Sequence, residues 1–281
     1  MYQTFRGRAT LPELRVPGVF AGRLHRLPDA RVLSFSLFGN DTRYVGALRN
    51  AELAASFYPG WTVRVYHDET VPGPALDLLR GAGADLWPVG AVGDGVPGTF
   101  WRFFVADDPN VEYFAVRDAD SRPSLRERGA VDEWLASGRG FHGMRDSPYH
   151  GMPLMAGLWG AHRGEVAAAM ASTVGAGRAS LGIEVAAARY VRAQPDLAFS
   201  SGGDQFFLET EVWPGAVTKA LVHDGHGCQS HRYAMPYPVA RHSTADYLGR
   251  AYLADDTPVR ADALEALPVP ACEKQHAVTP W

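Results

Sequence analysis

Short apolar runs alternate with helix-spaced segments through the first half of the chain, and this alternation constrains the fold most. Strands that alternate with helices predict a parallel sheet covered on both faces. Ligands of such sheets bind beyond the carboxyl ends of the strands. The β-prone runs span residues 31–38, 61–66, 84–89 and 111–116, and the helical patterns between them span 44–58, 74–81 and 99–106.

The second half of the chain has a different pattern. Ser124 and Glu127 form a capping box, which predicts the start of a helix. No repeat, linker or low-complexity segment divides the chain, so we expect one compact domain over 31–255 with an irregular lead-in at 1–30 and a tail at 256–281. Further helices are expected near 164–174, 180–194 and 201–213, and further strands near 139–144 and 220–223.

The fourth β-prone run ends in two aspartates, Asp118 and Asp120. Side chains alternate along a strand, so both carboxylates are expected to point the same way. Oxygen ligands suit Mg²⁺ or Mn²⁺, which commonly keep open positions for substrate phosphates. Two acidic residues also end many strands in solvated turns, so the pair alone leaves both interpretations open.

Composition excludes several classes of function. The net charge of −4 over 281 residues, without a dense Lys/Arg run, argues against a nucleic-acid partner. Only Cys228 and Cys272 are present, without metal-ligand spacing, which favours a reducing cytoplasm. No apolar run approaches the roughly 20 residues of a membrane span, so we expect no transmembrane segment.

Two other readings of the motifs are weaker. Gly93, Gly95 and Gly98 match the dinucleotide fingerprint, but they follow the third β-prone run, and Pro97 removes an amide that a pyrophosphate would need. A phosphoaspartate hydrolase would carry its acidic pair on the first strand rather than the fourth. Neither reading explains the remaining motifs of the chain.

Several motifs, in this order and spacing, resemble those of a bacterial and viral group of glycosyltransferases. The likeness to GT-A-fold, nucleotide-sugar-dependent enzymes with an Asp-x-Asp motif covers about residues 31–255. It implies a Rossmann-type, mostly parallel sheet flanked by helices, with a nucleotide-binding half at 31–122 and an acceptor and metal half at 123–255. The motifs are Thr99–Phe103, Arg117–Arg122, Val131–Trp134, His142–His150, Gly157–Gly160 and Gly203–Gln205.

The resemblance also implies a metal site. Asp118 and Asp120 would bind Mn²⁺ or Mg²⁺, which bridges the two phosphates of the donor. His223 would be a further metal ligand from late in the sequence. His226 is the alternative, because the His-x-x-His spacing does not decide which of the two histidines corresponds to the family's ligand. Such a cation neutralises the charge that grows on a departing nucleoside diphosphate.

The donor would contact residues from both halves. Arg102 and Arg117 would lie near the donor sugar or its phosphates, and Phe35, Phe38 and Asp41 would border the base and ribose. Trp159 would stack on a sugar face, since pyranose rings present apolar C–H surfaces to aromatic rings. A core position explains a tryptophan between glycines nearly as well.

Three residues are candidates for the chemical step. Asp204 and Gln205 follow two glycines at an expected helix start, where a carboxylate also caps free amides. The Asp-Gln pair favours a retaining enzyme with Gln205 under the anomeric carbon. Asp146 is a second candidate, as a base or as a partner of donor hydroxyls.

We therefore expect a cytoplasmic, metal-dependent glycosyltransferase that uses a nucleoside-diphosphate-sugar donor and a small-molecule or glycan acceptor. A nucleotidyltransferase that forms nucleotide-sugars is one alternative. Such enzymes usually carry a glycine-rich, basic phosphate-binding loop directly after the first strand, and residues 39–43 match that loop poorly. A non-catalytic protein that binds a nucleotide-sugar or glycan is the other alternative.

Overall fold

The computed structural model describes residues 30–39, 43–90, 95–174, 182–226, 234–241 and 246–259. Asp41, Gly93 and both cysteines lie outside these residues, as do most of the expected lead-in and tail. In the first half the elements are β1 (Ala30–Leu37), α1 (Arg43–Phe57), β2 (Trp61–His67), α2 (Gly73–Gly81), β3 (Asp85–Pro88), α3 (Gly98–Trp101), the 3-10 helix η2 (Arg102–Asp107) and β4 (Val111–Arg117).

The second half adds shorter elements. Ser124 caps α4 as the sequence predicts, because its hydroxyl accepts the N–H of Glu127. Pro214 does not end the third expected helix, which continues for two more residues. The elements are α4 (Leu125–Ser137), β5 (Phe141–Arg145), β6 (Leu158–His162), α5 (Arg163–Val174), α6 (Ile183–Ala193), α7 (Pro195–Ala198), α8 (Gly203–Phe207), the π-helical turn η4 (Leu208–Val212), α9 (Trp213–Ala216), β7 (Ala220–Asp224) and β8 (Ala234–Met235).

The strands form one sheet in the order β3-β2-β1-β4-β6-β5-β7-β8. All neighbours pair in parallel except β6, which is antiparallel to β4 and to β5. The expected α/β fold with a Rossmann-type, mostly parallel sheet is therefore confirmed. The strands β1, β2, β4, β5 and β7 all end at the same edge of the sheet.

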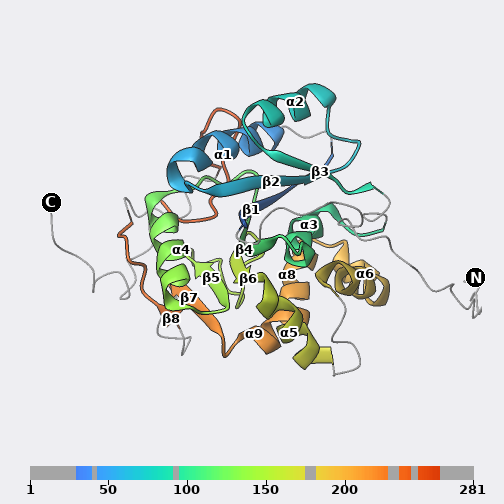
Figure 1. Ribbon diagram of the computed structural model, residues 1–281, viewed down its shortest axis with the longest axis vertical. Coiled ribbons are helices and arrows are strands. Elements are labelled where there is room, and N and C mark those ends of the chain that lie inside the picture. The colour runs from blue at the N-terminus through green and yellow to red at the C-terminus, as the bar shows by residue number, and fades with distance from the viewer. Residues whose placement is uncertain are drawn as a thin grey trace, which may run out of the picture.

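Helices cover both faces of the sheet (Figure 1). On the face that we call the α1 face, α1, α2 and α4 bury an apolar layer that includes Leu33, Ala51 and Trp134. On the opposite α5 face, α3, α5, α6, α8 and α9 pack over a larger layer that includes Phe103 and Trp159. Burial on both faces explains why the strands read as continuous apolar runs.

No helix within the described residues is long and apolar enough to cross a membrane.

Candidate functional site

The candidate site lies at the edge where the parallel strands end. Asp118 follows β4, Asp146 follows β5, and His226 lies two residues beyond β7. The antiparallel β6 starts at this edge, so Gly157 lies beside the end of β4. The topology thus gathers polar residues from several elements, as expected for an open α/β sheet.

Arg102 connects two acidic residues of this edge. Its Nη1 donates to Asp118 Oδ1, and its Nη2 donates to Asp204 Oδ2 at 2.9 Å. Its position is fixed by the first strand, because its backbone N–H donates to the hydroxyl of Ser36 and its carbonyl accepts from Ser34. Burial alone would lower the pKa of Arg102, but the two carboxylates outweigh it and raise that pKa, so the residue is a permanent cation.

The two aspartates of the motif interact with each other. Burial and the negative charge of Asp118 raise the pKa of Asp120, while Arg43 and Arg102 partly oppose the shift. A carboxylate pair whose repulsion is not fully compensated fits a hard divalent cation, which prefers oxygen ligands. Within the described part of the chain, no cluster of three or more His, Cys, Asp or Glu side chains surrounds such a site.

The segment 246–259 holds the turn that carries this pair. The N–H of Tyr252 donates to the carbonyl of Asp120 at 2.8 Å. The carboxylate of Asp256 accepts from Arg122 on one side and from Arg49 of α1 on the other. The position of Asp120 is thus set by a distant part of the sequence as well as by β4.

Asp204 lies in the first turn of α8, on the α5 face of the sheet. Its Oδ1 accepts the N–H of Gln205 at 3.0 Å, and its Oδ2 accepts from Arg102. Burial raises the pKa of Asp204, although Arg102 lowers it in part. The side-chain amide of Gln205 accepts from the N–H of Ala156 and donates to the carbonyl of Leu154. Gln205 therefore positions the loop before β6 in this arrangement.

Asp146 is a structural residue, which corrects its prediction as a base. Its fully buried carboxylate accepts from Nε and Nη2 of Arg126 at 3.1 and 2.8 Å. Arg241 and the N–H of Leu248 also donate to it, at 2.8 and 3.0 Å. Both carboxylate oxygens are thereby occupied, and neither is open to a substrate hydroxyl.

His223 is also placed differently from its prediction as a metal ligand. Its Nδ1 lies 2.9 Å from Nε2 of His142, and its Nε2 lies 3.0 Å from Oε2 of Glu133. These partners lie under α4 on the α1 face, whereas Asp118 is bonded to Arg102 of η2, on the α5 face. With both ring nitrogens engaged on the other side of the sheet, His223 does not reach the acidic pair.

Three predicted donor contacts belong to the interior instead. Trp159 is fully buried against Phe103 and Phe114, so it presents no face to a sugar. Arg117 points away from Asp118, as strand alternation requires, and donates through Nε to Glu127 at 2.7 Å. Phe35 packs in the core of the α1 face.

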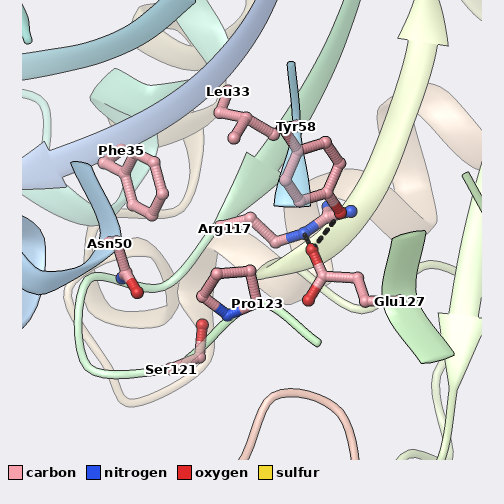
Figure 2. A pocket seen from close by; sticks show the side chains of 8 residues that line it. All are labelled: Leu33, Phe35, Asn50, Tyr58, Arg117, Ser121, Pro123 and Glu127. Atoms are coloured by element: carbon pink, nitrogen blue, oxygen red, sulfur yellow. Dashed lines mark hydrogen bonds and ion pairs between the residues drawn. The ribbon is translucent and has the colours of Figure 1, made fainter. Parts of the chain in front are cut away.

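A small cavity lies behind the acidic turn, on the α1 face. Figure 2 shows Tyr58 and Arg117 bonded to Glu127 along one side of it. It is lined by Leu33, Phe35, Asn50, Tyr58, Arg117, Ser121, Pro123 and Glu127. This cavity is therefore separate from the side of the turn on which Arg102 holds Asp118.

Of the two expected base contacts that the structure describes, Phe38 is the one near the edge. It lies half-buried after β1, with its ring edge-on to Trp101 and over Gly98. A side chain at Gly98 would collide with the ring of Phe38, which explains a glycine there. Asp41 lies outside the described residues.

His150 lies in the loop that follows β5. Burial lowers the pKa of His150 to about 4, with Asp118 opposing and His226 adding to the shift. The imidazole therefore lies within electrostatic range of both residues, and its Nδ1 accepts the N–H of Asp146 at 3.0 Å. Its place in the loop after β5 is visible only once the strand order is known.

Comparison with known proteins gives distant structural likenesses only. No protein-family model matches the chain, and a search of curated proteins finds no match. Glucosyl-3-phosphoglycerate synthase of M. tuberculosis is 14% identical over 66% of this chain and 70% of its own, with a TM-score of 0.36. Its complex with Mn²⁺, UDP and phosphoglyceric acid is 13% identical over 65% and 68%, with a TM-score of 0.36.

A galactosyltransferase, LgtC, in complex with donor and acceptor sugar analogs, is 13% identical over 70% of this chain and 73% of its own, with a TM-score of 0.42. Likenesses of this degree carry no argument about activity. The function must therefore be argued from the residues at the edge of the sheet.

Proposed function

We propose that this protein is a metal-dependent glycosyltransferase that transfers a sugar from a nucleoside-diphosphate donor to a small-molecule or glycan acceptor. The observation that carries the proposal is the pair Asp118 and Asp120 at the end of β4, tied through Arg102 to Asp204. Three carboxylates and one guanidinium at the ligand-binding edge of a Rossmann-type sheet suit a cation and a diphosphate.

Each residue would have a defined task in this reaction. Asp118 and Asp120 would hold Mn²⁺ or Mg²⁺, which supplies Lewis-acid stabilisation of the departing diphosphate. Phe38 would border the donor nucleotide at the end of β1. His226 replaces His223 as our candidate for a late metal ligand, because it follows the end of β7 at the edge of the sheet where Asp118 follows β4.

Asp204 and Arg102 would face the donor sugar. Arg102 is a rigid, permanently charged fork that can donate to sugar hydroxyls or phosphate oxygens. Asp204 is mostly buried and accepts from Arg102, so its position is fixed before substrate arrives. Gln205 would position the loop 154–156, to which its side chain is hydrogen-bonded. We also propose that the transfer retains the anomeric configuration of the sugar, as the Asp-Gln pair suggests.

Donor turnover tests the proposal. The protein is incubated with a panel of nucleotide-sugars and Mn²⁺, with and without candidate acceptors, and release of nucleoside diphosphate is measured. We expect turnover with one nucleotide class, its loss in EDTA, and a fall of at least 100-fold in Asp118→Asn and Asp120→Asn. Asp77→Asn, on the exposed surface of α2, is the matched control and should behave as wild type.

Two outcomes decide against the proposal. Full turnover in EDTA, or in either aspartate variant, removes the metal role. Binding of a nucleotide-sugar without any release of nucleoside diphosphate favours the non-catalytic alternative. The anomeric configuration of the product, read by NMR, tests retention separately.

A further inference from the structure

Arg102 already provides a positive charge at the acidic pair. One of its nitrogens donates to Asp118, and the side chain of Asp118 keeps 39% of its area exposed. The side chain of Arg102 is only 9% exposed, and its second terminal nitrogen donates to Asp204. Asp118 therefore has one oxygen engaged by an internal cation, although the carboxylate remains open to solvent.

The charges at this edge do not balance. The guanidinium of Arg102 donates to the carboxylates of Asp118 and Asp204, and Asp120 adds a third carboxylate two residues after Asp118 in the same turn. Arg43 is exposed and acts on Asp120 from the start of α1. A second positive charge at the pair would therefore be favourable, but it must share Asp118 with Arg102.

The two arms of Arg102 differ in their surroundings. Asp204 is 8% exposed, so its pair with Arg102 is shielded from solvent, whereas the pair with the more exposed Asp118 is screened by water. The backbone of Arg102 is also fixed, by hydrogen bonds to Ser34 and Ser36. The contact with Asp118 is thus the one that a cation from solvent can reach, and the contact with Asp204 is the shielded anchor.

We propose that Arg102 is a counter-cation that competes with a divalent metal ion for Asp118, so that it lowers metal affinity when no donor is bound. This inference rests on the proposed function, because it needs Asp118 to be a metal ligand. When Asp118 is released, Arg102 remains anchored on Asp204 with one arm free to donate to an anionic or hydroxylated group. Because Arg102 would weaken the binding of a metal ion that arrives without a donor, it would favour the binding of metal and diphosphate together.

Affinity for Mn²⁺ in the absence of nucleotide tests this proposal on the full chain. Free Mn²⁺ is counted by electron paramagnetic resonance during titration, and the fold of each variant is checked by circular dichroism. We expect Arg102→Gln to bind Mn²⁺ about tenfold more tightly than wild type, which corresponds to about 1.4 kcal/mol. Arg43→Gln removes the same charge near Asp120 but does not remove the bond to Asp118, and it should change the affinity less than about threefold.

The variants separate the possible outcomes. An equal gain in Arg102→Gln and Arg43→Gln overturns the proposal, because it shows a general charge effect. An unchanged or weaker affinity in Arg102→Gln overturns it as well. If that variant does not fold, Arg102→Lys replaces it. A single ammonium cannot bridge Asp118 and Asp204 as the fork does, so tighter binding is expected, and an unchanged value contradicts the proposal.

A further variant tests the proposed function independently. Asp118→Asn should lose Mn²⁺ binding whether or not Arg102 is present. Wild-type affinity in Asp118→Asn removes the metal site itself, whatever the Arg102 variants show. Failure of the competition and failure of the metal site are thus distinguishable.

Discussion

Gly157 offers a sharp test of the site because it lies directly beside Asp118. A Cβ built on Gly157 would lie 2.9 Å from Asp118 Oδ1 and closer still to Oδ2 and Cγ. Ordinary contacts begin near 3.5 Å, so the carboxylate must retreat by about an ångström or more. Gly157 does not have a positive φ, so alanine can adopt its backbone conformation.

The expected cost falls on activity more than on stability. A displacement of about 1 Å at a reacting geometry can reduce turnover roughly 100-fold, which is close to 3 kcal/mol. Because the colliding group is the end of a partly exposed side chain, overpacking should destabilise the fold by no more than about 1–3 kcal/mol. We therefore expect Gly157→Ala to reduce kcat by about 100-fold while its melting transition stays cooperative.

Two glycine variants serve as controls in the same donor-turnover assay. Gly151→Ala lies in the same loop with open space around it, and it should keep wild-type kcat. Gly182→Ala would displace the carboxylate of Asp107, which caps α6 by accepting from Ile183 and Glu184, so it should reduce stability but not kcat. A kcat for Gly157→Ala within twofold of wild type would refute the placement of Asp118 in the reaction.

Two further predictions concern stability. Burial lowers the pKa of His142 and of His223. Below about pH 6.5 the unfolded chain binds protons that the folded chain does not. The free energy of unfolding should therefore decrease as the pH is lowered, by up to about 1.4 kcal/mol per pH unit for each histidine. Urea midpoints measured from pH 7.5 to 5.5 check this slope, and a flat profile contradicts it. Glu127→Gln leaves Arg117 as a buried charge without its anionic partner. We therefore expect the free energy of unfolding to fall by about 3–5 kcal/mol and the melting temperature to fall by roughly 10 °C. A shift under about 2 °C by calorimetry would show that the ion pair is dispensable.

The sequence predicted the first half of the sheet well because its signals are local. The runs at 31–38 and 61–66 carry enough apolar, β-prone residues to identify β1 and β2 within one residue at each end. The capping box of Ser124 likewise depends on residues three positions apart. Leu158–His162 escaped assignment because a five-residue strand with Gly160 at its centre has no clear period.

The site residues depended on information that local patterns do not contain. His223 and Val222 alternate across β7, so a single step decides which face a side chain occupies, and the face depends on the strand's partners. The carboxylate of Asp146 accepts from Arg126, Arg241 and the N–H of Leu248, which lie 20, 95 and 102 positions away in the sequence. Such partners are brought together only by the fold.

In the proposed function, Asp118 and Asp120 together bind a divalent cation that contacts the donor diphosphate. Anomalous scattering from a crystal of the protein with Mn²⁺ and a nucleoside diphosphate measures this directly. We expect one manganese peak in contact with both carboxylates and with phosphate oxygens. A peak elsewhere, or a diphosphate bound with both aspartates turned away from the metal, contradicts it.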